Sequence, residues 1–199
     1  IRLPNRPIRL VWAGNVWPYD EKTRKFYFSS GLIESIKKLV SLGCEVDVLL
    51  DPHKDLNVSD PAWKPYKEIE KTGKFNFKFG VSSKDLDQVL SEYDFGLLHM
   101  SWSPVFEYTY PQKFEYVVPN KLFAYLSAGL PVLVSSEMAY QSWLVSTFGL
   151  GLVQGRKIND DFYKEISDFD YKGFASRLTS FRQHNNMDFH LSRVLPEYS

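Results

Sequence analysis

The chain has 199 residues, of which 44% are hydrophobic and 24% charged, close to the averages for an ordinary soluble globular protein. This composition excludes a disordered or collagen-like chain, and at roughly 100–200 residues per domain the length predicts one domain over residues 1–199. Lys and Arg together number 24, as do Asp and Glu, so the zero net charge argues against a nucleic-acid partner. The single cysteine, Cys44, excludes an internal disulfide and favours a reducing, cytoplasmic location.

Apolar residues alternate between runs typical of strands and 3.6-residue repeats typical of helices. In the first half of the chain we predict strands at 8–13, 46–50 and 75–79, and helices at 29–42, 66–72 and 82–92, the last opened by a capping box. In the second half we predict strands at 95–98, 131–135 and 151–154, and helices at 119–128, 137–147 and within 160–185. This order is typical of an α/β fold with a doubly wound, Rossmann-like parallel sheet.

In such a sheet, ligands bind outside the carboxyl ends of the strands, where the strand order reverses. The rule directs attention to the segments that follow Ala13, Leu50, Phe79, Met100 and Ser135. The segment 101–118 is an irregular loop long enough to be functional. Its aromatic residues are Trp102, Phe106, Tyr108, Tyr110, Phe114 and Tyr116. They could stack on a ligand, pack against another domain or cover the core. Trp12, Trp17 and Tyr19, near the end of the first strand, could share that surface.

Lys121 falls in the first turn of the predicted helix at 119–128, where a cation is unfavourable for the helix dipole. The same helix end presents free backbone N–H groups, which suit an anion. A lysine at this position therefore makes sense beside a bound diphosphate. The alternative is an ordinary solvated lysine on the surface.

The run from Pro119 to Val132 reads Pro-Asn-Lys-Leu-Phe-Ala-Tyr-Leu-Ser-Ala-Gly-Leu-Pro-Val. It resembles the helix Pro-x-Lys-Leu-Phe-Glu-Tyr-Leu-Ala-Ala-Gly-x-Pro-Val in the carboxy-terminal, donor-binding domain of GT-B-fold glycosyltransferases of the group 1 family. Weaker features agree with this resemblance, which covers about residues 8–155: Gly14, Gly80, Asp94 and the pair Gly149 and Gly151.

The resemblance implies that the chain is one half of a two-domain, metal-independent glycosyltransferase that uses a nucleotide-diphosphate sugar and needs no cofactor. Lys121 and the helix start at Pro119, Asn120 and Leu122 would bind the diphosphate, with close backbone approach at Gly14 and Asn15. The segment from His99 to Ser103, with His99 and Ser101, would line the sugar. The acceptor, a glycan or lipid-linked molecule of polysaccharide biosynthesis, would bind an amino-terminal domain absent from this chain, and the full enzyme could associate peripherally with a membrane.

Ala124 departs from the family pattern, which has a glutamate there to accept hydrogen bonds from the ribose hydroxyls. The second family carboxylate has no clear counterpart, although Glu107 and Glu115 lie in the long loop. The family often has a pair of basic residues after the first strand, and here Lys22, Arg24 and Lys25 are all candidates for that pair. Two alternatives therefore stay open: a non-catalytic GT-B-like scaffold or binding module with a degenerate ribose site and, with less support, a sugar-nucleotide epimerase.

Other chemistries find little support in the sequence. Asp85-Leu86-Asp87 and Asp168-Phe169-Asp170 match a D-x-D metal motif, but both are typical of helix starts. The four histidines are scattered without metal-ligand spacing, and His99 alone ends a strand, where it could equally be a core-edge residue. Neither a Gly-x-Ser-x-Gly elbow nor a Gly-x-Gly-x-x-Gly loop is present, which argues against a serine hydrolase and a dinucleotide-dependent dehydrogenase.

Overall fold

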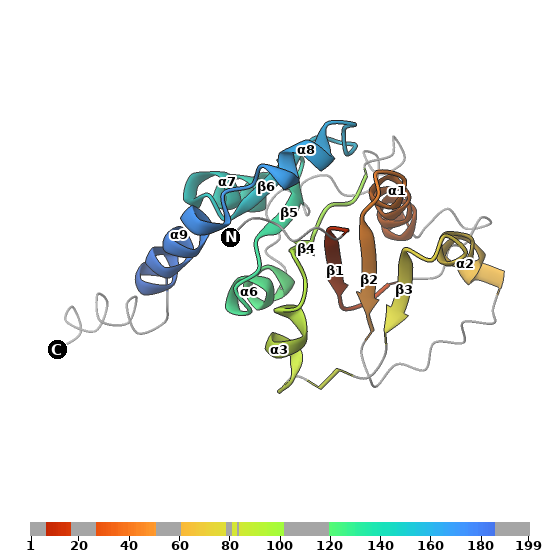
Figure 1. Ribbon diagram of the computed structural model, residues 1–199, viewed down its shortest axis with the longest axis horizontal. Helices are drawn as coiled ribbons and strands as arrows, with labels where there is room; N and C mark the ends of the chain where they lie inside the picture. The colour runs from red at the N-terminus through yellow and green to blue at the C-terminus, as the bar shows by residue number, and fades with distance from the viewer. Residues whose placement is uncertain are drawn as a thin grey trace.

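The computed structural model describes residues 7–16, 27–50, 61–78, 81–82, 84–101 and 120–185, with backbone only at 27–30 and 62. Their strands form a six-stranded, all-parallel sheet in the order β3-β2-β1-β4-β5-β6, which runs from right to left in Figure 1. The strands are β1 (Arg9–Ala13), β2 (Glu45–Leu49), β3 (Phe75–Lys78), β4 (Phe95–Leu97), β5 (Val132–Ser135) and β6 (Gly151–Gln154). The predicted Rossmann-like α/β fold is confirmed.

Helices connect the strands as the sequence periodicity predicts. They are α1 (Tyr27–Ser41), the short 3-10 helix η1 (Pro61–Trp63), α2 (Lys64–Glu70), α3 (Leu86–Leu90), α6 (Asn120–Ser127), α7 (Ala139–Phe148), α8 (Phe162–Ser167) and α9 (Tyr171–His184). None of the helices within these described ranges is long and apolar enough to cross a membrane.

The predicted helix at 82–92 is wrong in its extent, because α3 covers only Leu86–Leu90. The expected capping box does not form there. The Ser82 hydroxyl donates to the Asp85 carboxylate at 2.7 Å, and Asp85, the N-cap residue, makes no side-chain cap. The first turn therefore lacks the side-chain bonds to backbone N–H groups that would extend the helix toward Ser82.

Two apolar cores lie on opposite faces of the sheet because successive strand residues point to alternate sides. Leu10, Val46 and Val48 pack with α1, α2 and α8 in one core. Val11, Leu49 and Val132 pack with α6, α7 and α9 in the other. The sheet is thus covered on both faces, as an all-parallel sheet requires.

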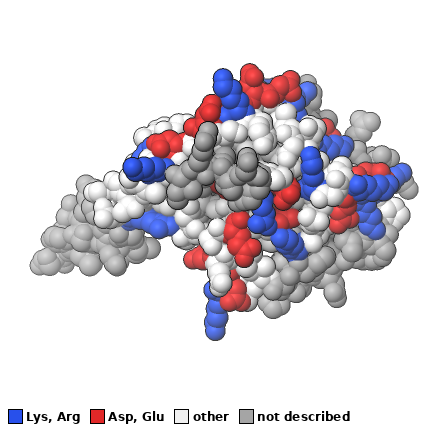
Figure 2. All heavy atoms as spheres, viewed as in Figure 1, with Lys and Arg blue, Asp and Glu red and all other residues white. Residues whose placement is uncertain are grey.

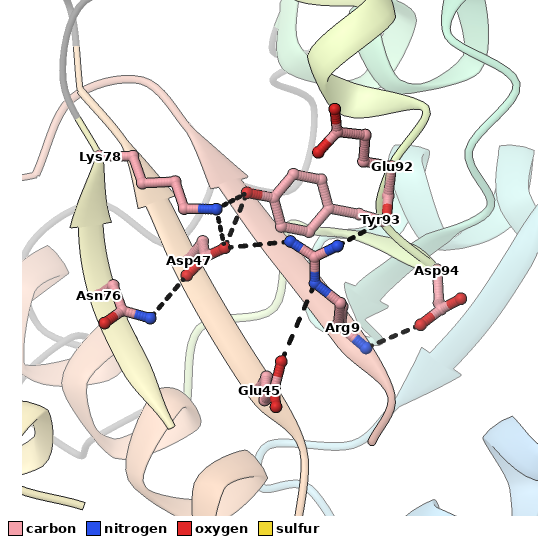
Figure 3. A network of polar contacts seen from close by, with 8 residues as sticks. All are labelled: Arg9, Glu45, Asp47, Asn76, Lys78, Glu92, Tyr93 and Asp94. Atoms are coloured by element: carbon pink, nitrogen blue, oxygen red, sulfur yellow. Dashed lines mark hydrogen bonds and ion pairs between the residues drawn. The ribbon is translucent and has the colours of Figure 1, made fainter. Parts of the chain in front are cut away.

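One region of the second face is polar rather than apolar. Asp47, in the middle of β2, is enclosed by side chains from β1, β3 and the turn before β4 (Figure 3). On the face of the molecule in Figure 2, basic and acidic side chains are interspersed and neither sign forms a continuous patch. The described residues on that face therefore form no broad basic surface for an anion.

Candidate functional site

The strand order reverses between β1 and β4, and this point locates the candidate site. From β1 the chain passes to α1 on one face, whereas α6, which follows β4 in the structure, lies on the other face. The carboxyl ends of β1 and β4 and the first turn of α6 therefore form one edge, which we call the switch-point edge. Parallel α/β sheets bind their ligands at such an edge.

Gly14 lies at this edge, directly after β1. Its φ of 122° is a conformation that favours glycine, and its N–H donates to the carbonyl of Leu49 at 2.9 Å. A Cβ atom built on Gly14 would come within 3.3 Å of Cε of Lys121. The absent side chain thus lets the Lys121 stem lie against the backbone, while the neighbouring Asn15 carbonyl accepts a hydrogen bond from the Trp12 indole at 3.1 Å.

Lys121 extends from the first turn of α6 across the switch-point edge. Its Nζ lies 3.3 Å from the centroid of the Trp12 ring, which belongs to the core on the other face of the sheet. The ring face attracts the ammonium electrostatically. Within the described part of the chain, no carboxylate lies within ion-pair distance of this lysine.

Burial lowers the pKa of Lys121 from its ordinary value to about 7. The shift has this direction because a poorly hydrated ammonium without a counter-ion is disfavoured relative to the neutral amine. A bound anion beside Nζ would reverse the effect and favour the charged form. The candidate site therefore contains a cation whose electrostatic partner is absent from the described residues.

His99 and Ser101 follow β4 but point into the protein. His99 is completely buried, with Nδ1 2.9 Å from the Ser35 hydroxyl and Nε2 2.9 Å from the carbonyl of Gly155. Because a carbonyl only accepts, Nε2 carries the hydrogen and Nδ1 accepts from Ser35. Burial lowers the pKa of His99 to about 4, so the ring is neutral at pH 7. Ser101 joins the same cluster through its N–H, which donates to the Ser35 hydroxyl at 2.8 Å.

The other predicted site residues have different surroundings. Asn120 is exposed at the first position of α6, whereas the Leu122 side chain is fully buried in the core and leaves only its backbone for a ligand. Predictions that concern Pro119, the basic residues and aromatics of 17–26, Gly80, and the loop residues of 102–118 lie outside the described residues.

The two D-x-D matches have ordinary helix-end roles. Asp85 and Asp87 lie at the N-cap and first turn of α3, and Asp170 is the N-cap of α9, where its carboxylate accepts from the Gly173 N–H. Asp168 differs from expectation, because it ends α8 instead of starting a helix. Among the residues that the structure describes, no group of three or more His, Cys, Asp or Glu side chains is placed to hold a metal ion.

The family model for the glucosyltransferase 3-like C-terminal domain matches residues 47–198 of the chain. The chain belongs to this family. The match agrees with the resemblance of the run from Pro119 to Val132 to the carboxy-terminal domain of GT-B glycosyltransferases. A search of curated proteins finds no sequence that matches.

Solved structures share the fold of this glucosyltransferase 3-like domain at low sequence identity. A UDP-forming α,α-trehalose-phosphate synthase from Burkholderia xenovorans has a TM-score of 0.56 and 9% identity, over 96% of this chain and 44% of that chain. The N-terminal domain of a trehalose-6-phosphate phosphatase from Candida albicans has a TM-score of 0.51 and 8% identity, over 90% and 38%. The glucosyltransferase 3-like chain thus spans less than half the length of these structures.

Several residues at or near the switch-point edge make contacts that the sequence does not predict. The sequence predicts Trp12 near this surface but not its contact with Lys121, and it gives no signal for Ser35 on α1. Tyr125, also on α6, inserts its hydroxyl between β1 and β4. Glu137, which lies two residues after β5 and approaches Arg156 at 3.6 Å, could have been flagged by its position after a strand.

Proposed function

We propose that this domain binds a nucleotide-activated sugar at the switch-point edge, with the diphosphate against Lys121, as the donor half of a metal-independent glycosyltransferase. The observation that carries the proposal is the position of Lys121. Its ammonium is held at the carboxyl edge of the sheet over Trp12, and the described residues supply no counter-ion. A diphosphate would supply that negative charge.

The neighbouring backbone supports the same ligand. Gly14 removes the side chain that would separate a phosphate from the end of β1. Asn120 begins α6, an eight-residue helix whose first N–H groups and dipole favour negative charge. Lysine, backbone and helix dipole would therefore act on one anion, which is the arrangement that phosphate sites use repeatedly.

The chemistry of sugar transfer gives Lys121 a second part to play. As the bond between the sugar and the diphosphate breaks, negative charge accumulates on the departing diphosphate. A fixed cation at that position stabilises the charge without a metal ion. Because the diphosphate favours the ammonium form, we also expect Lys121 to take up a proton when the donor binds near pH 7.5, above its pKa of about 7 in the free domain.

The direct test is titration calorimetry with UDP-, GDP- and dTDP-sugars; UDP is included because a structure of the same fold carries the name of a UDP-forming synthase. We expect one donor to bind, and Lys121→Ala to weaken its binding at least about tenfold, since hydrogen bonds to charged groups contribute about 1.5–3 kcal/mol. Lys172→Ala, at an exposed position on α9, is the matched control and should leave binding unchanged. Equal affinity in Lys121→Ala, or no binding of any donor, would contradict the proposal.

The rival function is a non-catalytic scaffold, and Ala124 favours it because an alanine cannot accept hydrogen bonds from ribose. Ala124 is partly buried on α6, three residues after Lys121. In an intact donor site, Ala124→Glu should increase nucleotide affinity by adding a charged acceptor. No increase would favour the scaffold.

The partner of this domain follows from the same proposal. An amino-terminal domain would carry the acceptor site and face the switch-point edge, so the domain alone would turn over little or no donor. Acceptors of polysaccharide biosynthesis, a cytoplasmic location and peripheral association of the full enzyme with a membrane belong to this proposal too. If this domain binds the donor and an amino-terminal domain binds the acceptor, adding the separately produced amino-terminal region of the parent protein should restore transfer to an acceptor.

A further inference from the structure

The ladder between β1 and β4 stops short of the switch-point edge. β1 pairs with β2 along all five of its residues, but with β4 only at Leu10–Phe95 and Val11–Gly96. Continuing the same register would place Ala13 opposite Leu98. In that continued ladder, the next hydrogen bond would run from the Ala13 N–H to the carbonyl of Leu97.

The hydroxyl of Tyr125 occupies the place of that missing bond. It accepts a hydrogen bond from the Ala13 N–H at 2.8 Å and donates to the Leu97 carbonyl at 3.4 Å. One oxygen atom thus stands between two backbone groups that would otherwise bind each other. Both groups keep a partner, which a buried N–H and carbonyl require.

Gly96 makes room for the tyrosine ring. A Cβ atom built on Gly96 would lie 2.3 Å from Cγ of Tyr125, so no other residue fits at that position of β4 without moving the ring. Tyr125 itself is completely buried. The ring and the strand are therefore matched to each other, and the hydroxyl has little freedom to leave the seam between β1 and β4.

Tyr125 also shares a helix face with Lys121. The two residues are four apart on α6, a spacing that places their side chains one above the other. Tyr125 contacts Ala13, whereas the Lys121 stem lies against the adjacent Gly14. One face of α6 therefore contacts two consecutive residues, the last of β1 and the one after it, through the Tyr125 hydroxyl in the sheet and the Lys121 stem at its edge.

We propose that Tyr125 is a positioning residue, which holds β1 and β4 apart at the switch point and so places Gly14 and Lys121 for the diphosphate. This inference rests on the proposed function and adds a residue that does not touch the donor. A phenylalanine would fill the same core volume. The hydroxyl is needed for the separation of the strands, because it supplies both hydrogen bonds at the end of the ladder.

The test compares Tyr125→Phe with Tyr66→Phe, which removes a hydroxyl from another completely buried tyrosine far from the edge, on α2. Calorimetry measures the affinity for the nucleoside diphosphate of the donor, from a panel of UDP, GDP and dTDP. NMR follows the Ala13 and Gly14 amide resonances and the titration of the Lys121 ammonium. We expect Tyr125→Phe to lower affinity about tenfold, the cost of about one hydrogen bond, and Tyr66→Phe to leave it unchanged.

The ligand-free measurements separate this inference from the proposed function. In Tyr125→Phe the Ala13 and Gly14 amides should shift and the pKa of Lys121 should move up toward its ordinary value, because its contacts with Gly14 and Trp12 change. If no nucleotide binds to the wild-type chain, the proposed function fails. These signals still show whether Tyr125 positions Gly14 and Lys121. The positioning role of Tyr125 would be overturned if a folded Tyr125→Phe showed unchanged amide resonances and an unchanged Lys121 pKa. It would also be overturned if the variant lost stability while its nucleotide affinity stayed the same.

A reporter keeps the inference testable if Tyr125→Phe does not fold. With 3-fluorotyrosine in place of tyrosine, the ¹⁹F resonance of position 125 should shift when Lys121 loses its proton near pH 7 or when the nucleotide binds. The resonance of position 66 should not shift in either titration. A position-125 resonance that follows neither event would overturn the inference that Tyr125 positions Lys121.

Discussion

Asp47 and Lys121 are both shielded charges on this sheet, and their surroundings are opposite. Asp47 receives hydrogen bonds from Tyr93 at 2.8 Å and Asn76 at 3.1 Å and pairs with Lys78 at 2.7 Å, with Arg9 at 3.7 Å (Figure 3). Lys121 contacts an indole face and a glycine backbone. Only the aspartate is satisfied within the described protein.

The pKa values record this difference. Burial alone would raise the pKa of Asp47, but the hydrogen bonds from Lys78, Tyr93 and Asn76 outweigh it and hold the pKa below its ordinary value. Burial lowers the pKa of Lys121 to about 7, and no ion pair with a carboxylate of the described residues opposes it. A charge that folding satisfies supports the fold, whereas a charge that folding leaves without a partner is available for a ligand.

Removing Asp47 should have the largest effect on stability. Asp47→Ala leaves Tyr93 and Asn76 without their acceptor and Lys78 without its paired carboxylate. We expect a loss of about 2 kcal/mol in the free energy of unfolding, moderated because Lys78 reaches water and keeps its hydrogen bond to the Tyr93 hydroxyl. Urea denaturation at pH 7 measures it, and nucleotide affinity should stay unchanged. A loss below about 0.5 kcal/mol would show that the two charges do not differ as argued.

Lys121→Met should change the free energy of unfolding in the opposite direction and stabilise the domain. The unfolded chain keeps the Lys121 proton up to about pH 10.4, whereas the folded domain loses it at about 7, so unfolding takes up a proton between these values and wild-type stability rises with pH. We therefore expect Lys121→Met to be more stable than the wild type by about 1 kcal/mol at pH 6.5. The difference should shrink as the pH rises toward 10. Urea denaturation at several pH values measures it, and a destabilised Lys121→Met at pH 6.5 would refute the argument.

The fold could be predicted from the sequence because its signals are local. The alternation in Phe75-Asn76-Phe77-Lys78 gives β3 one apolar and one polar side, and Gly43, with φ of 94°, lies in the turn that ends α1. The unusual position of Lys121 is also visible in the sequence, because a cation in the first turn of a helix conflicts with the helix dipole. Such conflicts are visible without knowing the tertiary structure.

The remaining site features depend on contacts between distant segments. His99 could equally have lined a sugar or lain in the core, and only its contacts with Ser35 and Gly155 show that both ring nitrogens are occupied. Tyr125 reads as one more apolar position of an amphipathic helix. Its hydroxyl becomes informative only when β1 and β4 lie on either side of it, 112 and 28 residues away in the chain.

Tyr66 offers a third kind of buried polar group and the smallest expected effect. Its hydroxyl lies in the core between α2 and β3, and among the described residues it has no hydrogen-bond partner. Unlike Asp47 it lacks donors, and unlike Lys121 it faces packed aromatic rings, Phe75 and Phe77, instead of an edge of the sheet. Burying an unbonded hydroxyl costs free energy, so Tyr66→Phe should raise the free energy of unfolding by about 0.5 kcal/mol in urea denaturation.

A clear loss of stability in Tyr66→Phe would mean that this hydroxyl is satisfied in solution. The absence of a partner could then not by itself distinguish a ligand site from a structural one. The case for Lys121 would then depend on its position at the switch-point edge.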